Sequence, residues 1–146
     1  MYGRLWNKNL DDEYKFGVIS ILGPRFTHSN VVWFDFPSRT IYHYDSFSVR
    51  AAHGVAKVLM KLFSGWTIIG TEHKHLVQRE EIVENGKIRY RCKDYFCTWW
   101  CLLYLMNRTK GLSHEQSCKN AKYSELLGLI IQMCINYRKL LEDVKI

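Results

Sequence analysis

The stretch DYFCTWWCLLYL, residues 94–105, decides how this chain is expected to fold. Turn-like residues precede Cys97, and the apolar and aromatic residues after it predict a buried helix over 97–107. A thiol in the first turn of a helix lies near the positive end of the helix dipole and near free N–H groups, which favour a thiolate. Cys97 is therefore the candidate nucleophile.

Two predicted strands upstream form a hairpin whose open ends carry a histidine and an aspartate. Residues 30–36 and 40–44 are rich in β-branched and aromatic side chains, and a turn at 37–39 separates them. His28 comes just before the first strand, and Asp45 comes just after the second. Because the outer ends of two antiparallel strands meet, the hairpin is expected to bring these two side chains together.

The other predicted elements give an α+β fold, with strands first and helices mostly later. They are strands over 16–22 and 66–69, a helix over 48–63, and one long helix or two shorter ones over 113–139.

Two short motifs mark where further elements turn or begin. Asn85-Gly86 is typical of a type I′ turn and predicts a second hairpin between residues 77–83 and 87–90. Ser113 and Gln116 have the spacing of a capping box at a helix start.

The composition is that of one globular domain spanning residues 1–146. Hydrophobic residues make up 47% of the chain and charged residues 24%, which excludes a disordered chain. Residues 1–14 are polar and are interpreted as a loose N-terminal arm. The formal charge of +7 permits a polyanionic partner.

Cysteine usage and the N-terminus predict a compartment. Five cysteines are an odd number, without the spacing of a disulfide framework, and the first ten residues lack a signal-peptide pattern. No apolar run reaches the length of a membrane span. We therefore expect a reducing intracellular compartment, host cytoplasm or nucleus, or a virion, and neither secretion nor membrane insertion.

A thiol peptidase needs a thiolate, a histidine that takes the thiol proton, and a third group that orients the imidazole. Each candidate alone has an ordinary explanation. Cys97 could be a small buried hydrophobe, His28 a loop residue, and Asp45 the cap of the following helix. The three residues together, with the hairpin between His28 and Asp45, favour a cysteine peptidase.

Three segments resemble a known family. HSNVVWFD at 28–35, TIYHYDS at 40–46 and DYFCTWW at 94–100 are similar to the His, Asp-Ser and Cys blocks of the clan CE cysteine peptidases. That clan includes SUMO-specific proteases, adenovirus-type maturation proteases and enzymes of large DNA viruses, and this chain looks closest to the last group. The resemblance implies a papain-like α+β fold, in which a small mixed or antiparallel sheet packs on a central helix starting at Cys97.

The resemblance also implies roles for individual residues. Cys97 would be the nucleophile, His28 the general base, and Asp45 the group that orients His28. Gln78, the only glutamine upstream of Cys97, would stabilise the oxyanion. The implied reaction is hydrolysis of a peptide or isopeptide bond in a viral precursor or ubiquitin-like protein substrate, without a metal or other cofactor.

The sequence departs from the family pattern at three places. Ser29 follows the histidine where many members carry tryptophan, and Phe96 rather than glycine precedes the cysteine. Gln78 also lies farther from Cys97 than in the compact cellular motif, because the predicted second hairpin intervenes. A catalytically degenerate protein, acting as a virion-structural or interaction module, is therefore the alternative function.

A basic stretch offers a second kind of partner. Lys87, Arg89, Arg91 and Lys93 alternate along a predicted strand with Tyr90 between them, a pattern that permits weak contact with a polyanion or nucleic acid. A solvated strand face is the more frequent explanation of such an alternation.

Other cysteines and histidines were weighed as well. His73, His75, Cys92 and Cys97 are metal-ligand types, but their spacing matches no common zinc module. Cys101, one helical turn after Cys97, is interpreted as a core residue, and Cys92 is the second choice for a nucleophile.

Overall fold

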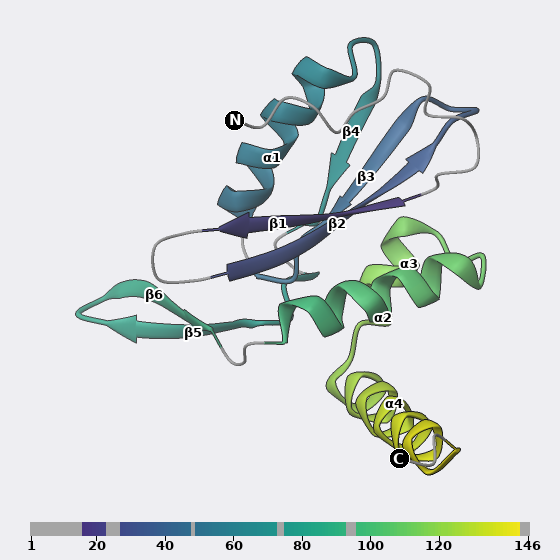
Figure 1. The fold of residues 1–146 in the computed structure, drawn as a ribbon. Coiled ribbons are helices and arrows are strands. Elements are labelled where there is room, and N and C mark those ends of the chain that lie inside the picture. The colour runs from purple at the N-terminus through teal and green to yellow at the C-terminus, as the bar shows by residue number, and fades with distance from the viewer. Residues whose placement is uncertain (1–15, 23–26, 48, 73–74, 93–95, 144–146) are drawn as a thin grey trace.

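The computed structural model describes residues 16–22, 27–47, 49–72, 75–92 and 96–143. These ranges form an α+β fold with a four-stranded mixed sheet, a separate two-stranded hairpin and four helices (Figure 1). Most of the predicted strands and helices are present, within a few residues of the expected bounds. The predicted N-terminal arm, residues 1–14, lies outside the described residues.

The main sheet has the strand order β1-β2-β3-β4. Its strands are β1 (Phe16–Leu22), β2 (Thr27–Asp35), β3 (Thr40–Tyr44) and β4 (Thr67–Gly70). The first three strands are antiparallel neighbours, whereas β4 runs parallel to β3. A parallel neighbour requires a crossover connection, and helix α1 (Val49–Leu62) supplies it.

Strand β2 begins earlier than the sequence predicted. We expected His28 just before the strand, but it is the second residue of β2. The reason is that β2 has two partners. Its later part pairs with β3, up to Val31 opposite Tyr44, whereas pairing with β1 continues to Thr27 opposite Leu22. The ladder with β1 therefore extends β2 past the end of the β2–β3 hairpin.

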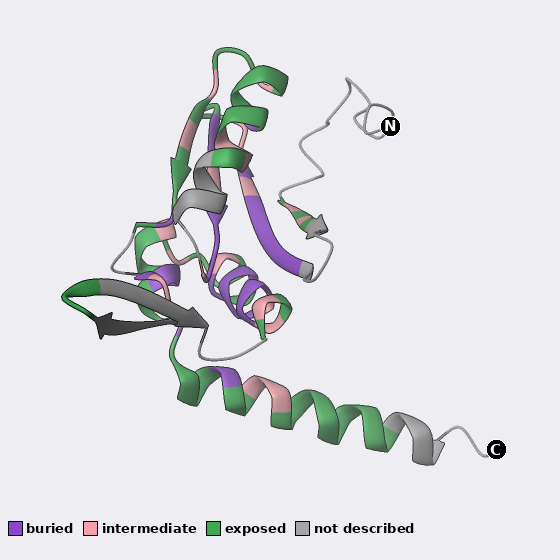
Figure 2. Cartoon of the chain, turned by 90° about the vertical axis from the view of Figure 1, so that its left-hand side faces the viewer, coloured by how far each residue is buried: buried purple, intermediate pink, exposed green. Residues whose placement is uncertain are grey.

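The sheet separates two apolar cores because neighbouring residues of a strand point to opposite faces. Val32 and Ile41 pack with Leu59 of α1 on one side. On the other side, Val31 and Tyr44 pack against helix α2 (Cys97–Thr109). Figure 2 shows the buried parts of β2 and α2 in purple.

Helix α2 is the central buried helix that the sequence predicted. Trp100, Leu103 and Tyr104 are among its buried residues. The Tyr104 ring stacks on Tyr44 of β3, with 4.5 Å between ring centroids and 5° between planes. This contact joins the helix to the sheet through two large aromatic surfaces.

The second hairpin is formed by β5 (Arg79–Glu84) and β6 (Lys87–Cys92). Asn85 and Gly86 have φ angles of 50° and 71°, as a type I′ turn requires, which confirms the predicted turn. β5 starts two residues later than expected, so Gln78 precedes the strand. The hairpin is not part of the main sheet and projects from the body of the molecule (Figure 1).

The C-terminal part forms two helices, α3 (His114–Lys119) and α4 (Tyr123–Asp143). The Ser113–Gln116 capping box is present at the start of α3. In α4, Leu126 is fully buried, whereas the neighbouring Leu127 is exposed. Among the described residues, no helix is both long enough and apolar enough to cross a membrane.

Candidate functional site

The β2–β3 pairing places a histidine beside an aspartate. In the register of this pair, Val31 stands opposite Tyr44, so continuing the ladder sets Asn30 opposite Asp45. His28 lies two residues before Asn30 and therefore on the same face of β2. The His28 imidazole donates from Nε2 to Oδ1 of Asp45 over 3.0 Å, as the hairpin hypothesis predicted.

The Asp45 carboxylate is fully buried, and several donors hold it in place. Besides His28, the backbone N–H of Phe47 donates to Oδ1 over 2.8 Å. The Asn30 amide donates to Oδ2 over 3.4 Å. A buried charge needs such donors, because its removal from water is otherwise costly. The main chain is fixed as well, because the backbone N–H of Asp45 donates to Thr71 Oγ1 over 2.8 Å.

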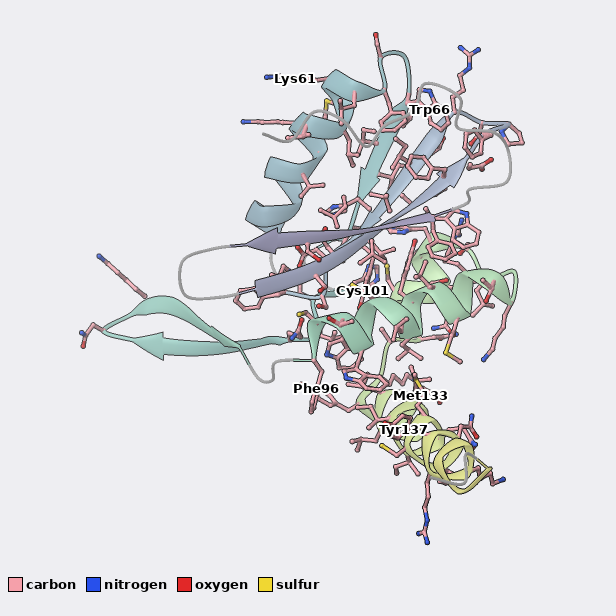
Figure 3. The ribbon with its side chains drawn as sticks, in the orientation of Figure 1. Lys61, Trp66, Phe96, Cys101, Met133 and Tyr137 are labelled. Atoms are coloured by element: carbon pink, nitrogen blue, oxygen red, sulfur yellow. The ribbon has the colours of Figure 1, made fainter. Side chains whose placement is uncertain are left out.

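Cys97 reaches this region as the first residue of α2. The backbone N–H of Ser29 donates to Cys97 Sγ over 3.4 Å. Two further contacts fix the helix to β2 at the same residue. The Ser29 hydroxyl is 2.9 Å from that of Thr98, and the Cys101 thiol donates to the Ser29 carbonyl over 3.3 Å. In Figure 3, Cys101 lies on the side of α2 that faces the sheet.

The environment shifts the ionisation of His28 and Cys97 in opposite directions. Burial alone would lower the pKa of His28, but its interactions with Asp45 and Cys97 raise the pKa above 6.5. Burial alone would raise the pKa of Cys97, but the Ser29 N–H and the His28 imidazole lower it below the ordinary thiol value. Both shifts favour a thiolate–imidazolium pair.

The two nitrogens of the His28 ring have separate partners. Because Nε2 donates to Asp45, Nδ1 is the nitrogen left to interact with the Cys97 thiol. Cys101 is different. It is buried, and burial raises its pKa far above the ordinary thiol value, as suits the predicted core residue.

Gln78 is tied to the residue that follows Asp45. Its backbone N–H donates to the Ser46 carbonyl over 2.9 Å, and the Ser46 hydroxyl donates to its side-chain Oε1. Both residues are buried. These contacts place Gln78 in the connection between the sheet and the second hairpin. Its oxyanion role stays a prediction.

The histidines and cysteines considered as zinc ligands in the sequence analysis are placed as follows. The described residues contain no group of three or more side chains that could hold a metal ion. His75 is buried, His73 lies outside the described residues, and only the backbone of Cys92 is placed, in β6.

The predicted basic strand is β6, but its register weakens the polyanion interpretation. The Cα partner of Lys87 is Glu84, that of Arg89 is Ile82, and that of Arg91 is Glu80. Acidic residues thus stand opposite two of the basic positions. Lys93 lies outside the described residues.

The sequence analysis did not assign three residues to the site that the structure places there: Ser29, Asn30 and Thr71. Asparagine is unfavourable in a strand of β-branched and aromatic residues, so Asn30 was the one detectable signal. Ser29 and Thr71 are ordinary strand and loop residues, and only their long-range contacts distinguish them.

Comparisons with protein-family models, with curated proteins and with solved structures found no match for this chain.

Proposed function

We propose that this protein is a cysteine peptidase of the clan CE type that hydrolyses a peptide or isopeptide bond. One observation carries the proposal: chain segments far apart in sequence bring Cys97, His28 and Asp45 to one place. Cys97 is bonded by Ser29 from β2, and His28 of the same strand is bonded to Asp45. The opposite pKa shifts of Cys97 and His28 are those that a thiol nucleophile and its base need.

The mechanism follows from this geometry. His28 takes the thiol proton at Nδ1, while its Nε2–H stays on Asp45. The Cys97 thiolate attacks the carbonyl carbon, and His28 then gives the proton to the leaving amine as the acyl-thioester forms. Water, deprotonated by His28, hydrolyses the thioester and releases Cys97.

The oxyanion of the tetrahedral intermediate needs hydrogen-bond donors. We assign the Gln78 amide to this role, as the family resemblance implies. The N–H groups in the first turn of α2 are further donors, because an α-helix leaves its first N–H groups without intrahelical acceptors. The substrate class is a viral precursor or a ubiquitin-like conjugate.

The first prediction concerns labelling of Cys97. The protein should react covalently with members of a panel of peptide and ubiquitin-like probes that carry a thiol-reactive group. Cys97→Ala should abolish labelling, because the pKa of Cys97 is lowered beside His28, whereas burial raises the pKa values of Cys101 and Cys118. Intact-protein mass spectrometry measures the adduct, and circular dichroism checks that the variant is folded.

Cys134→Ala is the matched control. Cys134 is an exposed free cysteine on α4 outside the site, so its loss should leave labelling unchanged. Persistent labelling in folded Cys97→Ala would contradict the assignment of Cys97 as the nucleophile. A folded wild-type protein that reacts with no probe would favour the alternative, a catalytically degenerate interaction module.

A further inference from the structure

We infer that Asn30 is a positioning residue of this site, whose side-chain amide holds the Asp45 carboxylate in the orientation that His28 needs. The inference rests on the proposed function and adds a residue to which the sequence analysis gave no role. Its basis is the buried hydrogen-bond arrangement around Asp45.

The first argument is the division of donors between the two carboxylate oxygens. Oδ1 accepts from His28 Nε2 over 3.0 Å and from the Phe47 N–H over 2.8 Å. Oδ2 accepts from Asn30 Nδ2 over 3.4 Å. Asn30 therefore bonds the oxygen that His28 does not use, and it resists rotation of the carboxylate away from the imidazole.

The second argument is that asparagine at position 30 lowers the stability of the folded protein. The residue has no exposed surface, and its Oδ1 has no hydrogen-bond partner among the described residues. A buried polar atom without a partner is destabilising, and a β-branched residue would suit the strand better. Among the described residues, the one hydrogen bond that its side-chain amide makes is the bond to Asp45. That contact is thus the feature that distinguishes Asn30 from an apolar residue of similar size.

The third argument is the effect that the Asn30 hydrogen bond has on the charges of Asp45, His28 and Cys97. A donor on Oδ2 stabilises the charged carboxylate, and the charged carboxylate stabilises protonated His28, which in turn stabilises the Cys97 thiolate. In the part of the chain that the structure describes, the other titratable groups that interact with Asp45 are His43, Tyr44 and Cys101.

These neighbours do not titrate at neutral pH. Burial lowers the pKa of His43 to about 4, and it raises the pKa values of Tyr44 and Cys101 well above their ordinary values. Between pH 5 and 9, a change in Cys97 reactivity therefore reports on Cys97, His28 and Asp45.

The test is the pH dependence of Cys97 alkylation by iodoacetamide, a small reagent that needs no substrate recognition. Mass spectrometry of the Cys97 peptide gives the rate at each pH for the wild type and Asn30→Leu. We expect the midpoint of the thiolate profile to move to higher pH and the rate at pH 7 to fall about tenfold, the lower end of the effect of losing a hydrogen bond to a charged group.

Asn107→Leu is the matched control, because Asn107 is another buried asparagine, on α2, whose Nδ2 has no partner among the described residues. It should alkylate as the wild type does. Asn30→Ser, whose shorter side chain cannot make the same contact, repeats the test if Asn30→Leu does not fold. A wild-type profile in a folded Asn30 variant would overturn the inference.

The same data separate this inference from the proposed function. If the wild type cleaves or reacts with none of the substrate probes but the Asn30 variants shift the alkylation profile, the peptidase proposal fails and the role of Asn30 stands. If the probes react and the profile does not shift, the role of Asn30 fails alone.

Discussion

At the scale of single residues, the site depends on one buried carboxylate. Asp45 has no exposed surface. Its carboxylate oxygens accept hydrogen bonds from the side chain of Asn30, two residues after His28 on β2, and from the backbone N–H of Phe47. Preorganised donors of this kind let His28 change its charge without rearrangement of its partner. The chemistry assigned to Cys97 therefore depends on residues that never contact a substrate.

Gln78 permits a prediction that separates two steps of the proposed reaction. Gln78→Met keeps the approximate size of the side chain but removes its N–H donors. If Gln78 binds the oxyanion, kcat for the best substrate should fall by about 10²–10³, because the donor acts on the tetrahedral intermediate. Iodoacetamide alkylation of Cys97 should not change, because that reaction forms no oxyanion.

Thermal unfolding of Gln78→Met must be measured alongside, since Gln78 is buried and bonded by Ser46. An equal loss of alkylation and of kcat in a folded variant would show that Gln78 instead supports the thiol.

At the scale of elements, helix α4 is packed on the fold at its start and exposes apolar side chains farther along. Its first turns pack on α2 through Leu126, and Tyr123 packs edge-on against Trp100. Farther along, large apolar side chains such as Met133 and Tyr137 are exposed, at 43% and 63% of their surface (Figure 3). The helical periodicity predicted the helix correctly but did not show which of its apolar residues are buried.

Leu126 and Leu127 are adjacent on α4 and give a matched pair. Leu126→Ala should destabilise the protein by about 2–5 kcal/mol, because Leu126 is fully buried and its truncation leaves a cavity. Leu127→Ala should change the free energy of unfolding by less than about 0.5 kcal/mol, because Leu127 is 52% exposed. Urea denaturation measures both. Equal losses in the two variants would mean that α4 is covered in solution.

At the scale of the whole molecule, two histidines govern stability in acid: His43, which is buried, and His114, which is partly buried. Burial lowers the pKa values of His43 and His114 to about 4 each, from an ordinary 6.5. Neither ring nitrogen of His43 has a hydrogen-bond partner among the described residues. His114 is bonded through Nδ1 to the Tyr104 hydroxyl over 2.8 Å.

Stability should therefore fall between pH 6.5 and 4. In this window the unfolded chain binds protons at both histidines and the folded protein does not, so unfolding is favoured as pH falls. Each histidine contributes a loss on the order of 3 kcal/mol. His28 acts in the opposite direction: its raised pKa adds stability below pH 6.5, which is lost as pH rises through the folded pKa.

His43→Leu tests this account. The variant should be as stable as the wild type at pH 7, because it replaces a buried imidazole whose ring nitrogens have no hydrogen-bond partner among the described residues. It should lose less stability than the wild type by pH 4.5. Denaturant unfolding at both pH values measures the difference. A decline as steep as that of the wild type would contradict the role given to His43.

Local patterns predicted much of this fold, because the causes are local. Asn85-Gly86 sets a turn through positive φ angles, Ser113 caps a helix through a contact three residues away, and a short turn over residues 36–39 joins β2 to β3. The proximity of His28 and Asp45 followed from the same hairpin, since the outer ends of two antiparallel strands meet.

The sequence by itself thus determined the elements and the His28–Asp45 pair. Only the tertiary structure decided the long-range contacts of the site, because they join residues that no short-range sequence pattern relates. Ser29 meets Cys97 across 68 positions, and Ser46 meets Gln78 across 32. The extra length of β2 likewise depends on β1 as a second partner. Packing of α2 against β2, not any property of Cys97 itself, brings the thiol to its N–H donor and to His28.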